Sequence, residues 1–358
     1  MSSMAPDIAQ APMLGDRSAR AQTLSLVLIL LLGAAIVLSL AVGASGTSLW
    51  QAVLGLFTGE EVGVRERIIL MDIRLPRTVM GVLVGAALAV SGAVMQGLFR
   101  NPLADPGLVG VSAGAGFGAI VAIVLGGMLP AGIAAMFGSS LVPVAAFVGA
   151  WASMLLLYRV STRRGRTSVA TMLLAGIALA ALMGAVQGVL IYMADDAQLR
   201  TLTFWGMGSI AGATWGKLLV ATPLILLALA GAPFLARGLN ALALGEAAAA
   251  HVGIPVQRLK NAAILMVALA VGSSVAVSGG IGFVGIVVPH LLRLLVGPDH
   301  RYLLLNSALL GAALLLCADV ISRVIVAPAE LPIGIVTATL GGPFFLWILL
   351  RQRGVLEM

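Results

Sequence analysis

Charged residues are scarce in this chain. Asp, Glu, Lys and Arg together make up 10% of its 358 residues, whereas hydrophobic residues make up 60% and the mean hydropathy is +1.10. Soluble domains carry about a quarter charged residues, because their surface has to be covered with polar groups. The scarcity of charge excludes a disordered chain and a soluble enzyme of ordinary type, and it indicates a membrane protein.

Cysteine is scarcer still. The chain contains one cysteine, Cys317, which lies inside an apolar run. A single thiol cannot form a disulfide within the chain, so a disulfide-stabilised scaffold is excluded.

Long polar segments are also few, and the stretches without Asp, Glu, Lys or Arg predict the membrane spans. A spanning helix needs about 20 mostly apolar residues. The charge-free stretches cover 21–59, 78–99, 106–158, 167–194, 218–236, 261–289, 302–318 and 331–350. The longest holds two spans, separated by Gly126, Gly127 and Pro130 with a second break at 138–140, and the run from 261 holds two more, the second of them short. The sequence thus predicts an all-α polytopic membrane protein with about ten transmembrane helices.

The basic residues predict the orientation of these spans. The chain has 21 Lys and Arg residues against 14 Asp and Glu, a net charge of +7. If an even number of spans starts on the inside, two thirds of the basic residues fall on inner segments, as the positive-inside rule requires. We therefore expect one transmembrane permease domain over 22–351, with both tails, 1–21 and 352–358, in the cytoplasm. Membrane orientation accounts for the basic charge, so no nucleic-acid partner is predicted.

An internal repeat relates the two halves of the chain. A shift of 187 residues places the AVSG of 89–92 on the AVSG of 276–279 and the Pro of 102 on that of 289. The copies begin in the second and the seventh expected spans, so they face opposite ways, and inverted repeats are typical of transporters. Two similar glycine-rich helices without a common origin are the alternative.

The sequence lacks the residues that would energise transport. The phosphate-binding GxxxxGK[ST] loop is absent, so ATP hydrolysis has to come from a partner and we predict no enzyme activity in this chain. Intramembrane acids, which carry protons in secondary transporters, are almost missing, and Asp319 shares a helix face with Arg323 near an outer end. An ion-coupled secondary transporter or channel, which would depend on Asp319 or Glu330, is one alternative. A membrane scaffold without transport is another.

A polar segment, 237–260, interrupts the later spans. It is rich in Ala and contains Glu246 and His251, and Gly253 and Pro255 would end a helix there. The residues predict a short helix on the inner face that can transmit force. A plain surface loop is the alternative.

Several blocks, in order, resemble the permease subunits of type II ABC importers for cobalamin, ferric siderophores and haem. The resemblance covers nearly all of 74–351 and rests on RLPR (74–77), LVGAALAVSGAVMQGLFRNPLADPGLVGVSAGAG (83–116), MLLAGIAL (172–179), ALGEAAAAHVG (243–253), VSGGIGFVGIVVPHLLRLLVGPDHR (277–301) and AELPIGIVTATLGGPFFLWIL (329–349). It implies an inverted-repeat fold of ten helices and a homodimer with a central pathway in a bacterial inner membrane. It also implies two ATPase subunits on the cytoplasmic side, which bind ATP and Mg²⁺, and a periplasmic binding protein outside. The resemblance implies no cofactor or metal in this chain.

The resemblance implies contacts with both partners. Arg74, Arg77 and Arg323 match arginines that pair with glutamates of the binding protein, and interfacial anchoring of Arg74 and Arg77 is the alternative. Residues 239–256 resemble the helix that couples the permease to its ATPase. Its expected contacts are Leu244, Gly245, Glu246, His251 and Gly253.

A gate and a pathway are implied as well. Asn101, Leu103 and Ser168 match positions of a cytoplasmic gate, although Val169 departs from the hydroxyl residue expected beside Ser168. The fifth and tenth spans would line the pathway, and helix packing is an equal alternative for each candidate there. The pathway candidates are Met172, Met183, Gln187, Tyr192 and Thr337.

The segment 192–215 indicates the cargo. Its ADDAQLR, TFW and MGS resemble haem permeases most. An apolar pathway with methionines and a tyrosine near its mouth suits an iron porphyrin. We therefore predict haem import, with ferric siderophore and cobalamin import as alternatives, because the binding protein selects the cargo in this family.

Overall fold

The computed structural model of the chain describes residues 17–42, 64–163 and 166–356. Most of the expected tail 1–21 and the end of 352–358 lie outside these residues. In chain order the helices are α1 (Ser18–Ala41), α3 (Val64–Ile68), α4 (Leu75–Phe99), α5 (Val111–Leu125), α6 (Ala131–Phe137), α7 (Leu141–Ser161), α8 (Val169–Met193), α9 (Asp196–Gly206), α10 (Trp215–Leu242), α11 (Glu246–His251), α12 (Val256–Ser278), α13 (Val284–Val296), α14 (His300–Val324) and α15 (Ile333–Leu356). A π-helical turn (Ile69–Arg74) joins α3 to α4, and 3-10 turns lie at Pro106–Val109, Gly126–Met128 and Gly138–Ser140. The strands β1 (Thr162–Arg163) and β2 (Arg166–Thr167) form an antiparallel hairpin.

The helices account for the expected spans. Within the described residues, eight helical stretches are long and apolar enough to cross a membrane, and α13 and the 333–347 part of α15 are shorter apolar helices. The predicted break between the third and fourth spans is confirmed, because a 3-10 turn, the short helix α6 and a second 3-10 turn separate α5 from α7.

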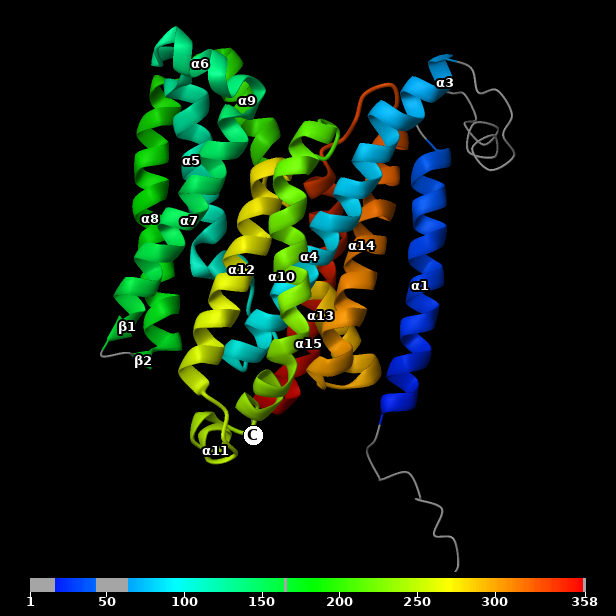
Figure 1. The fold of residues 1–358 in the computed structure, drawn as a ribbon, viewed down its shortest axis with the longest axis vertical. Coiled ribbons are helices and arrows are strands. Elements are labelled where there is room, and N and C mark those ends of the chain that lie inside the picture. The colour runs from blue at the N-terminus through cyan, green and yellow to red at the C-terminus, as the bar shows by residue number, and fades with distance from the viewer. Residues whose placement is uncertain (1–16, 43–63, 164–165, 357–358) are drawn as a thin grey trace, which may run out of the picture.

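The spans run between two ends of the bundle, which we name after their short helices. The α9 end carries α3, α6 and α9, and the α11 end carries α11 and the β1–β2 hairpin (Figure 1).

Helix α4 forms the centre of the bundle, and 89% of its spanning window is buried. It packs against α10, α12, α13 and α14. Glycines allow this close approach: a Cβ on Gly85 would collide with the backbone of Gly311 on α14. A Cβ on Gly92 would collide with the backbone of Gly285 on α13. By contrast, α1 and α8 lie at the periphery, with 17% of their spanning windows buried.

The two copies of the sequence repeat run in opposite directions, since α4 descends from the α9 end while α12 rises from the α11 end (Figure 1). Gly85 of α4 lies against the backbone of α14, whereas Gly272 of α12 lies against the side chain of Ala150 on α7. The two copies differ in secondary structure from Gly92 and Gly279 onward. Helix α4 continues to residue 99, whereas α12 ends before Gly279, whose φ of 69° an L side chain rarely adopts.

The later matches of the sequence repeat do not correspond in structure. Residues 102–110 form a connection with a 3-10 turn, whereas 289–297 lie mainly in α13. The matching prolines and glycines in these segments occupy different structures, because the break after α12 changes the register between the halves.

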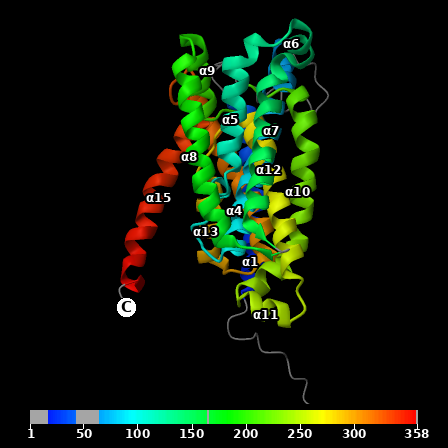
Figure 2. The same cartoon turned by 90° about the vertical axis from the view of Figure 1, so that its left-hand side faces the viewer.

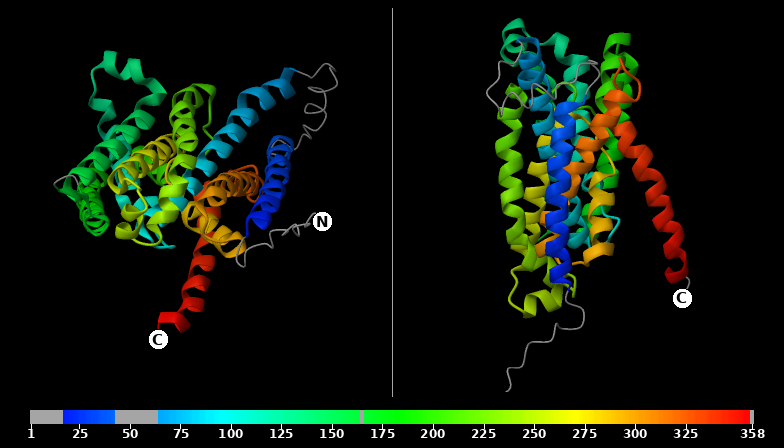
Figure 3. Two further views of the ribbon diagram at one scale, coloured as in Figure 1. Left: turned by 60° about the horizontal axis from the view of Figure 1, so that its bottom comes forward. Right: turned by 90° about the vertical axis from the view of Figure 1, so that its right-hand side faces the viewer.

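Helix α15 leans away from the rest of the bundle on its way toward the α11 end (Figures 2 and 3). It contacts α13 and α14. Large apolar side chains on its free side, including Leu340 and Leu346, are exposed. Helix α8 also has an exposed apolar face, with Leu174, Ile177 and Leu182 on it.

Candidate functional site

Four charged side chains form a cluster at the α9 end, which we call the arginine cluster; three of them are buried, and the fourth, Glu330, is exposed at its edge. Arg77 of α4 lies 2.9 Å from Asp319 of α14 (Nη2–Oδ1) and 2.9 Å from Glu330 (Nη1–Oε2). Arg323, one turn after Asp319, lies 3.1 Å from the other carboxylate oxygen of Asp319. The expectation that Asp319 and Arg323 share a helix face is confirmed by this contact.

The arginine cluster also closes the end of α1. Arg323 donates hydrogen bonds to the carbonyl oxygens of Ser39 and Val42, at 3.2 and 3.1 Å. Arg74 donates to the carbonyl oxygen of Leu40 at 2.7 Å. Carbonyls in the last turn of a helix lack partners within the helix, and cationic donors satisfy them. The cluster thereby joins α1, α4, α14 and the connection from α14 to α15.

The three arginines that the sequence predicts to dock the binding protein, Arg74, Arg77 and Arg323, are only 3–5% exposed. Their docking role stays a prediction. A partner carboxylate would have to displace Asp319 or Glu330 to reach Arg77. The sequence did not predict the burial of these arginines, because it does not show which polar side chains near the end of a helix point into the bundle.

Other cations are exposed at the α9 end. They are Arg65 and Arg67 of α3 and Arg200 of α9. Arg200 lies over the ring of Phe204, 5.9 Å from its centroid. A protein that approaches this end meets these side chains before the arginine cluster.

Asp319 and Glu330 are the acids on which ion coupling would depend. Both are paired with arginines, and Asp319 is fully buried between α4 and α14. Protonation of Asp319 would leave two buried guanidinium groups without its charge, which is costly. The geometry therefore favours a structural role for Asp319 over proton transport.

The short helix α11 projects from the opposite end. Leu244 and His251 are exposed, and the His251 Nδ1 lies 2.7 Å from the carbonyl oxygen of Ala247 in the same helix. The expected coupling helix, 239–256, is longer than the observed one, because 239–242 belong to α10. Gly245 and Gly253 bracket α11 with φ values of 107° and 83°, which L side chains rarely adopt.

Lys260 of α12 connects α11 to the β1–β2 hairpin. Its Nζ lies 2.8 Å from Glu246 Oε1 and donates to the carbonyl oxygen of Thr167 at 2.9 Å. The Lys260 side chain is 5% exposed, whereas that of Glu246 is 49% exposed. Gln257, on the preceding turn of α12, accepts a hydrogen bond from the Thr167 amide at 2.8 Å. These contacts link α11 to the segment from which α8 starts.

Two of the three gate candidates lie on one cavity, which we call the gate cavity. Asn101 and Ser168 line it together with Glu246 and Lys260, and its volume is about 530 Å³. Leu103 belongs to the same turn as Asn101, because its amide donates to Asn101 Oδ1 at 2.9 Å. The sequence-predicted gate residues are therefore neighbours in space, although their gate function stays a prediction.

Sequence reasoning missed several residues of this end. Arg100 and Arg166 line the gate cavity. Arg293 and Asn240 line a second cleft of about 450 Å³, together with Asp299. Little in the sequence indicated these residues, because each of them is a single polar residue near the end of a hydrophobic stretch.

Asp299 is a fixed negative charge in the second cleft. It accepts hydrogen bonds from Asn240 Nδ2 at 2.7 Å and from Arg301 Nη2 at 2.6 Å. Burial opposes its ionisation, but the hydrogen bonds from Arg301 and Asn240 outweigh burial and lower the pKa of Asp299 to about 2. The carboxylate therefore stays ionised at neutral pH.

Within one chain, the residues predicted to line the pathway do not form a continuous surface. Met172 and Thr337 are buried, Met183 and Gln187 are half-buried, and Tyr192 is 92% exposed. Packing within the chain accounts for Met172 and Thr337. In the described part of the chain, no three His, Cys, Asp or Glu side chains come together as a metal site would require.

Comparison with known proteins decides the family. The model of the FecCD transport family matches residues 28–351. The chain belongs to the FecCD transport family. This FecCD protein is 50% identical to the hemin transport system permease protein HmuU of Yersinia pestis over 79% of its own length and 83% of that relative. It is 43% identical to the vitamin B12 import system permease protein BtuC of Klebsiella pneumoniae subsp. pneumoniae, over 83% and 86% of the two chains.

Solved structures agree with this family. A transporter described as an ABC transporter of the metal-chelate type, in an inward-facing conformation, has a TM-score of 0.80 and 32% identity, covering 92% of this chain and 99% of that one. PsaBC from Streptococcus pneumoniae, in complex with a Fab, shares the fold with a TM-score of 0.54 at 17% identity, over 79% and 92% of the chains. The FecCD protein is therefore a multi-pass membrane permease of an ABC importer rather than an enzyme.

Proposed function

We propose that this permease moves haem from a periplasmic binding protein to the cytoplasm of a bacterium, across its inner membrane. The observation that carries the proposal is the 50% identity to a hemin permease over 79% of the chain. The relatives that import vitamin B12 make cobalamin the second candidate, at 43% identity. A ferric siderophore is the third, because the similar solved transporter is of the metal-chelate type.

In this proposal the α11 end faces the cytoplasm. Arginines gather there, with Arg100 and Arg166 on the gate cavity and Arg293 on the second cleft. Cytoplasmic segments of membrane proteins are enriched in Lys and Arg. This orientation places both termini in the cytoplasm, if the ten expected spans all cross.

Two ATPase subunits dock at α11 and supply the energy, binding ATP and Mg²⁺ themselves. Leu244 and His251 are exposed for that contact, and Glu246 is half-exposed. Movement of α11 reaches Thr167 and the adjacent Ser168 through Lys260. The gate at Asn101 and Ser168 opens or closes in response.

A second copy of the chain completes the pathway. The exposed apolar faces of α8 and α15 need a partner or lipid to cover them, and α15 diverges from the rest of the bundle (Figure 2). In the dimer, Gln187 and Tyr192 of α8 face the cargo near the α9 end. Packing within one chain cannot explain a tyrosine that is 92% exposed.

The binding protein docks at the α9 end. The exposed Arg65, Arg67 and Arg200 attract its carboxylates, and the arginine cluster keeps the platform rigid. Direct pairing of Arg77 or Arg323 with the binding protein requires a carboxylate of that protein to replace Glu330 or Asp319 in the cluster.

Reconstitution tests the proposal. The permease is placed in liposomes with its ATPase and binding protein, and uptake of haem, cobalamin and a ferric siderophore is measured with and without ATP. We expect ATP-dependent uptake of haem alone. Uptake of another cargo would overturn the choice of haem, and uptake driven by a proton gradient without ATP would overturn the mechanism.

A further inference from the structure

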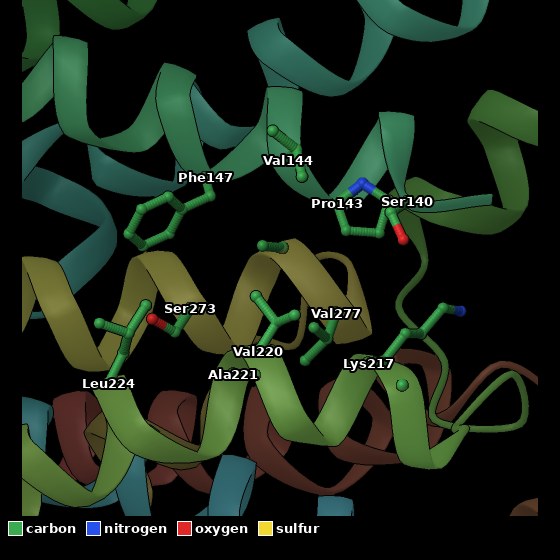
Figure 4. A pocket seen from close by; sticks show the side chains of 12 residues that line it. Ser140, Pro143, Val144, Phe147, Lys217, Val220, Ala221, Leu224, Ser273 and Val277 are labelled. Atoms are coloured by element: carbon green, nitrogen blue, oxygen red, sulfur yellow. The ribbon is translucent and has the colours of Figure 1, made fainter. Parts of the chain in front are cut away.

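An apolar groove lies between α7, α10 and α12 near the α9 end (Figure 4). Its volume is about 110 Å³. Hydrocarbon side chains make up nearly all of its walls. They include Pro143 and Phe147 of α7, Val220 and Leu224 of α10, and Val277 of α12.

One polar group faces the groove without a partner. Ser273 of α12 is 2% exposed, and its hydroxyl has no hydrogen-bond partner among the described residues. The next residue, Ser274, donates to the carbonyl oxygen of Ala270 in its own helix at 2.7 Å. Buried hydroxyls are nearly always hydrogen-bonded, so the one on Ser273 indicates a group that enters the groove.

The mouth of the groove carries a cation. Lys217 Nζ donates to the carbonyl oxygen of Gly212 at 2.8 Å, and an ammonium group has three donors. No carboxylate in the described part of the chain pairs with Lys217. In Figure 4 the nitrogen of Lys217 lies at the same end of the groove as the hydroxyl of Ser140, and Ser273 lies toward the other end.

The position of Lys217 sets the depth of the groove in the membrane. It belongs to the first turn of α10, two residues after Trp215. Tryptophan and lysine at the start of a spanning helix mark the level of the lipid headgroups. The groove therefore runs from headgroup level into the hydrocarbon region, and its rim residue Val220 is exposed to that region.

We propose that this groove binds an anionic phospholipid of the surrounding membrane. The phosphate lies on Lys217, and part of one acyl chain fills the space between Phe147 and Leu224. An ester carbonyl, which lies between phosphate and acyl chain, accepts the hydrogen bond from Ser273. Water alone does not account for the groove, because around Ser273 the walls are apolar and give a water molecule too few polar partners. The bound lipid joins α7 of the first half to α10 and α12 of the second.

The site depends on the membrane location of the chain and not on its cargo, so it is tested on the permease alone. The purified protein is incubated with a phosphatidylglycerol analogue that carries a diazirine on its acyl chain, irradiated and mapped by peptide mass spectrometry. We expect the label on α7 and α10 beside the groove. Val220→Phe should remove the label by covering the groove, whereas Leu219→Phe, its exposed neighbour outside the groove, should retain it.

Native mass spectrometry measures the polar contacts. Lys217→Gln should weaken phosphatidylglycerol binding about tenfold, because it removes a charged hydrogen-bond donor. Ser273→Ala should weaken it about threefold, and the matched Ser274→Ala should leave it unchanged. Labelling that persists in Val220→Phe, or affinity that Lys217→Gln does not change, would overturn the proposal. Displacement of the label by inorganic phosphate would also overturn it, since that outcome indicates an anion site rather than a lipid site.

Discussion

The two ends of the bundle hold their buried cations in different ways. At the α9 end, Arg77 and Arg323 share Asp319, whose side chain is 1% exposed, and all three belong to long spanning helices. At the α11 end, Lys260 pairs with Glu246, which is half-exposed and belongs to a helix of 6 residues. A short element with few buried contacts opens at lower free energy than a central helix. We therefore expect the α9 end to resist deformation and the α11 end to transmit it.

The largest effect on stability is expected from Asp319→Asn. This change leaves Arg77 and Arg323 without their shared charge, and breaking a buried ion pair costs about 3–5 kcal/mol of the free energy of unfolding. Thermal unfolding of the purified permease measures it. Glu330→Gln is the matched control: Arg77 keeps Asp319, so the loss should be about 1 kcal/mol. A normally folded Asp319→Asn protein without uptake would instead indicate ion coupling.

Lys260→Met tests the contacts by which Lys260 connects α11 to the β1–β2 hairpin. The methionine keeps the apolar stem of the side chain but loses the bonds to Glu246 and Thr167, so ATP hydrolysis should continue while uptake falls about tenfold. The ratio of cargo transported to ATP hydrolysed in the reconstituted system measures this loss. Arg258→Met, an exposed position on the same helix, is the control. Equal loss in both variants would show that Lys260 has no special part in coupling.

Glu246→Gln should have a smaller effect. The half-exposed Glu246 contributes about 0.5–1 kcal/mol to its ion pair with Lys260, so uptake should fall about threefold. In a double-mutant cycle, Glu246→Gln should add nothing once Lys260→Met is present, because the two residues form one contact. Fully additive losses would mean that Glu246 acts on the ATPase directly and not through Lys260.

The smallest effect is expected at Asp299. Its pKa of about 2 lies below the ordinary pKa of an aspartate, about 4, so its contribution to stability is complete above about pH 4 and is lost as the pH falls toward 2. Because its side chain is 32% exposed, this contribution is below about 1 kcal/mol. Asp299→Asn should remove that acid dependence of unfolding, which a pH series measures, and an unchanged profile would assign the dependence to other groups.

The pattern of membrane spans was predictable because spanning helices need long apolar stretches without charged residues, and such stretches are visible in the sequence. The breaks at 126–130 and 138–140 followed from glycine and proline, and the pairing of Asp319 with Arg323 followed from their spacing on one helix. The approach of Asn101 to Ser168 came from the family resemblance, because they are far apart in the chain.

The burial of the arginines and the part played by Lys260 were not predictable from the sequence. Lys260 meets Glu246 and Thr167 through the packing of three separate segments, and no local pattern relates those positions. Hydropathy places the docking arginines only near the ends of spans. Whether such a side chain points outward or into the bundle depends on the acids of other helices, here Asp319 and Glu330.

The break in the repeat bears on the direction of transport. Two inverted copies that stayed identical would give both faces of the membrane the same structure, and such a protein would have no polarity of its own. The copies diverge after Gly92 and Gly279, where α4 continues and α12 gives way to α13. The two faces of the membrane therefore meet different structures, even though similar sequences approach them from opposite sides.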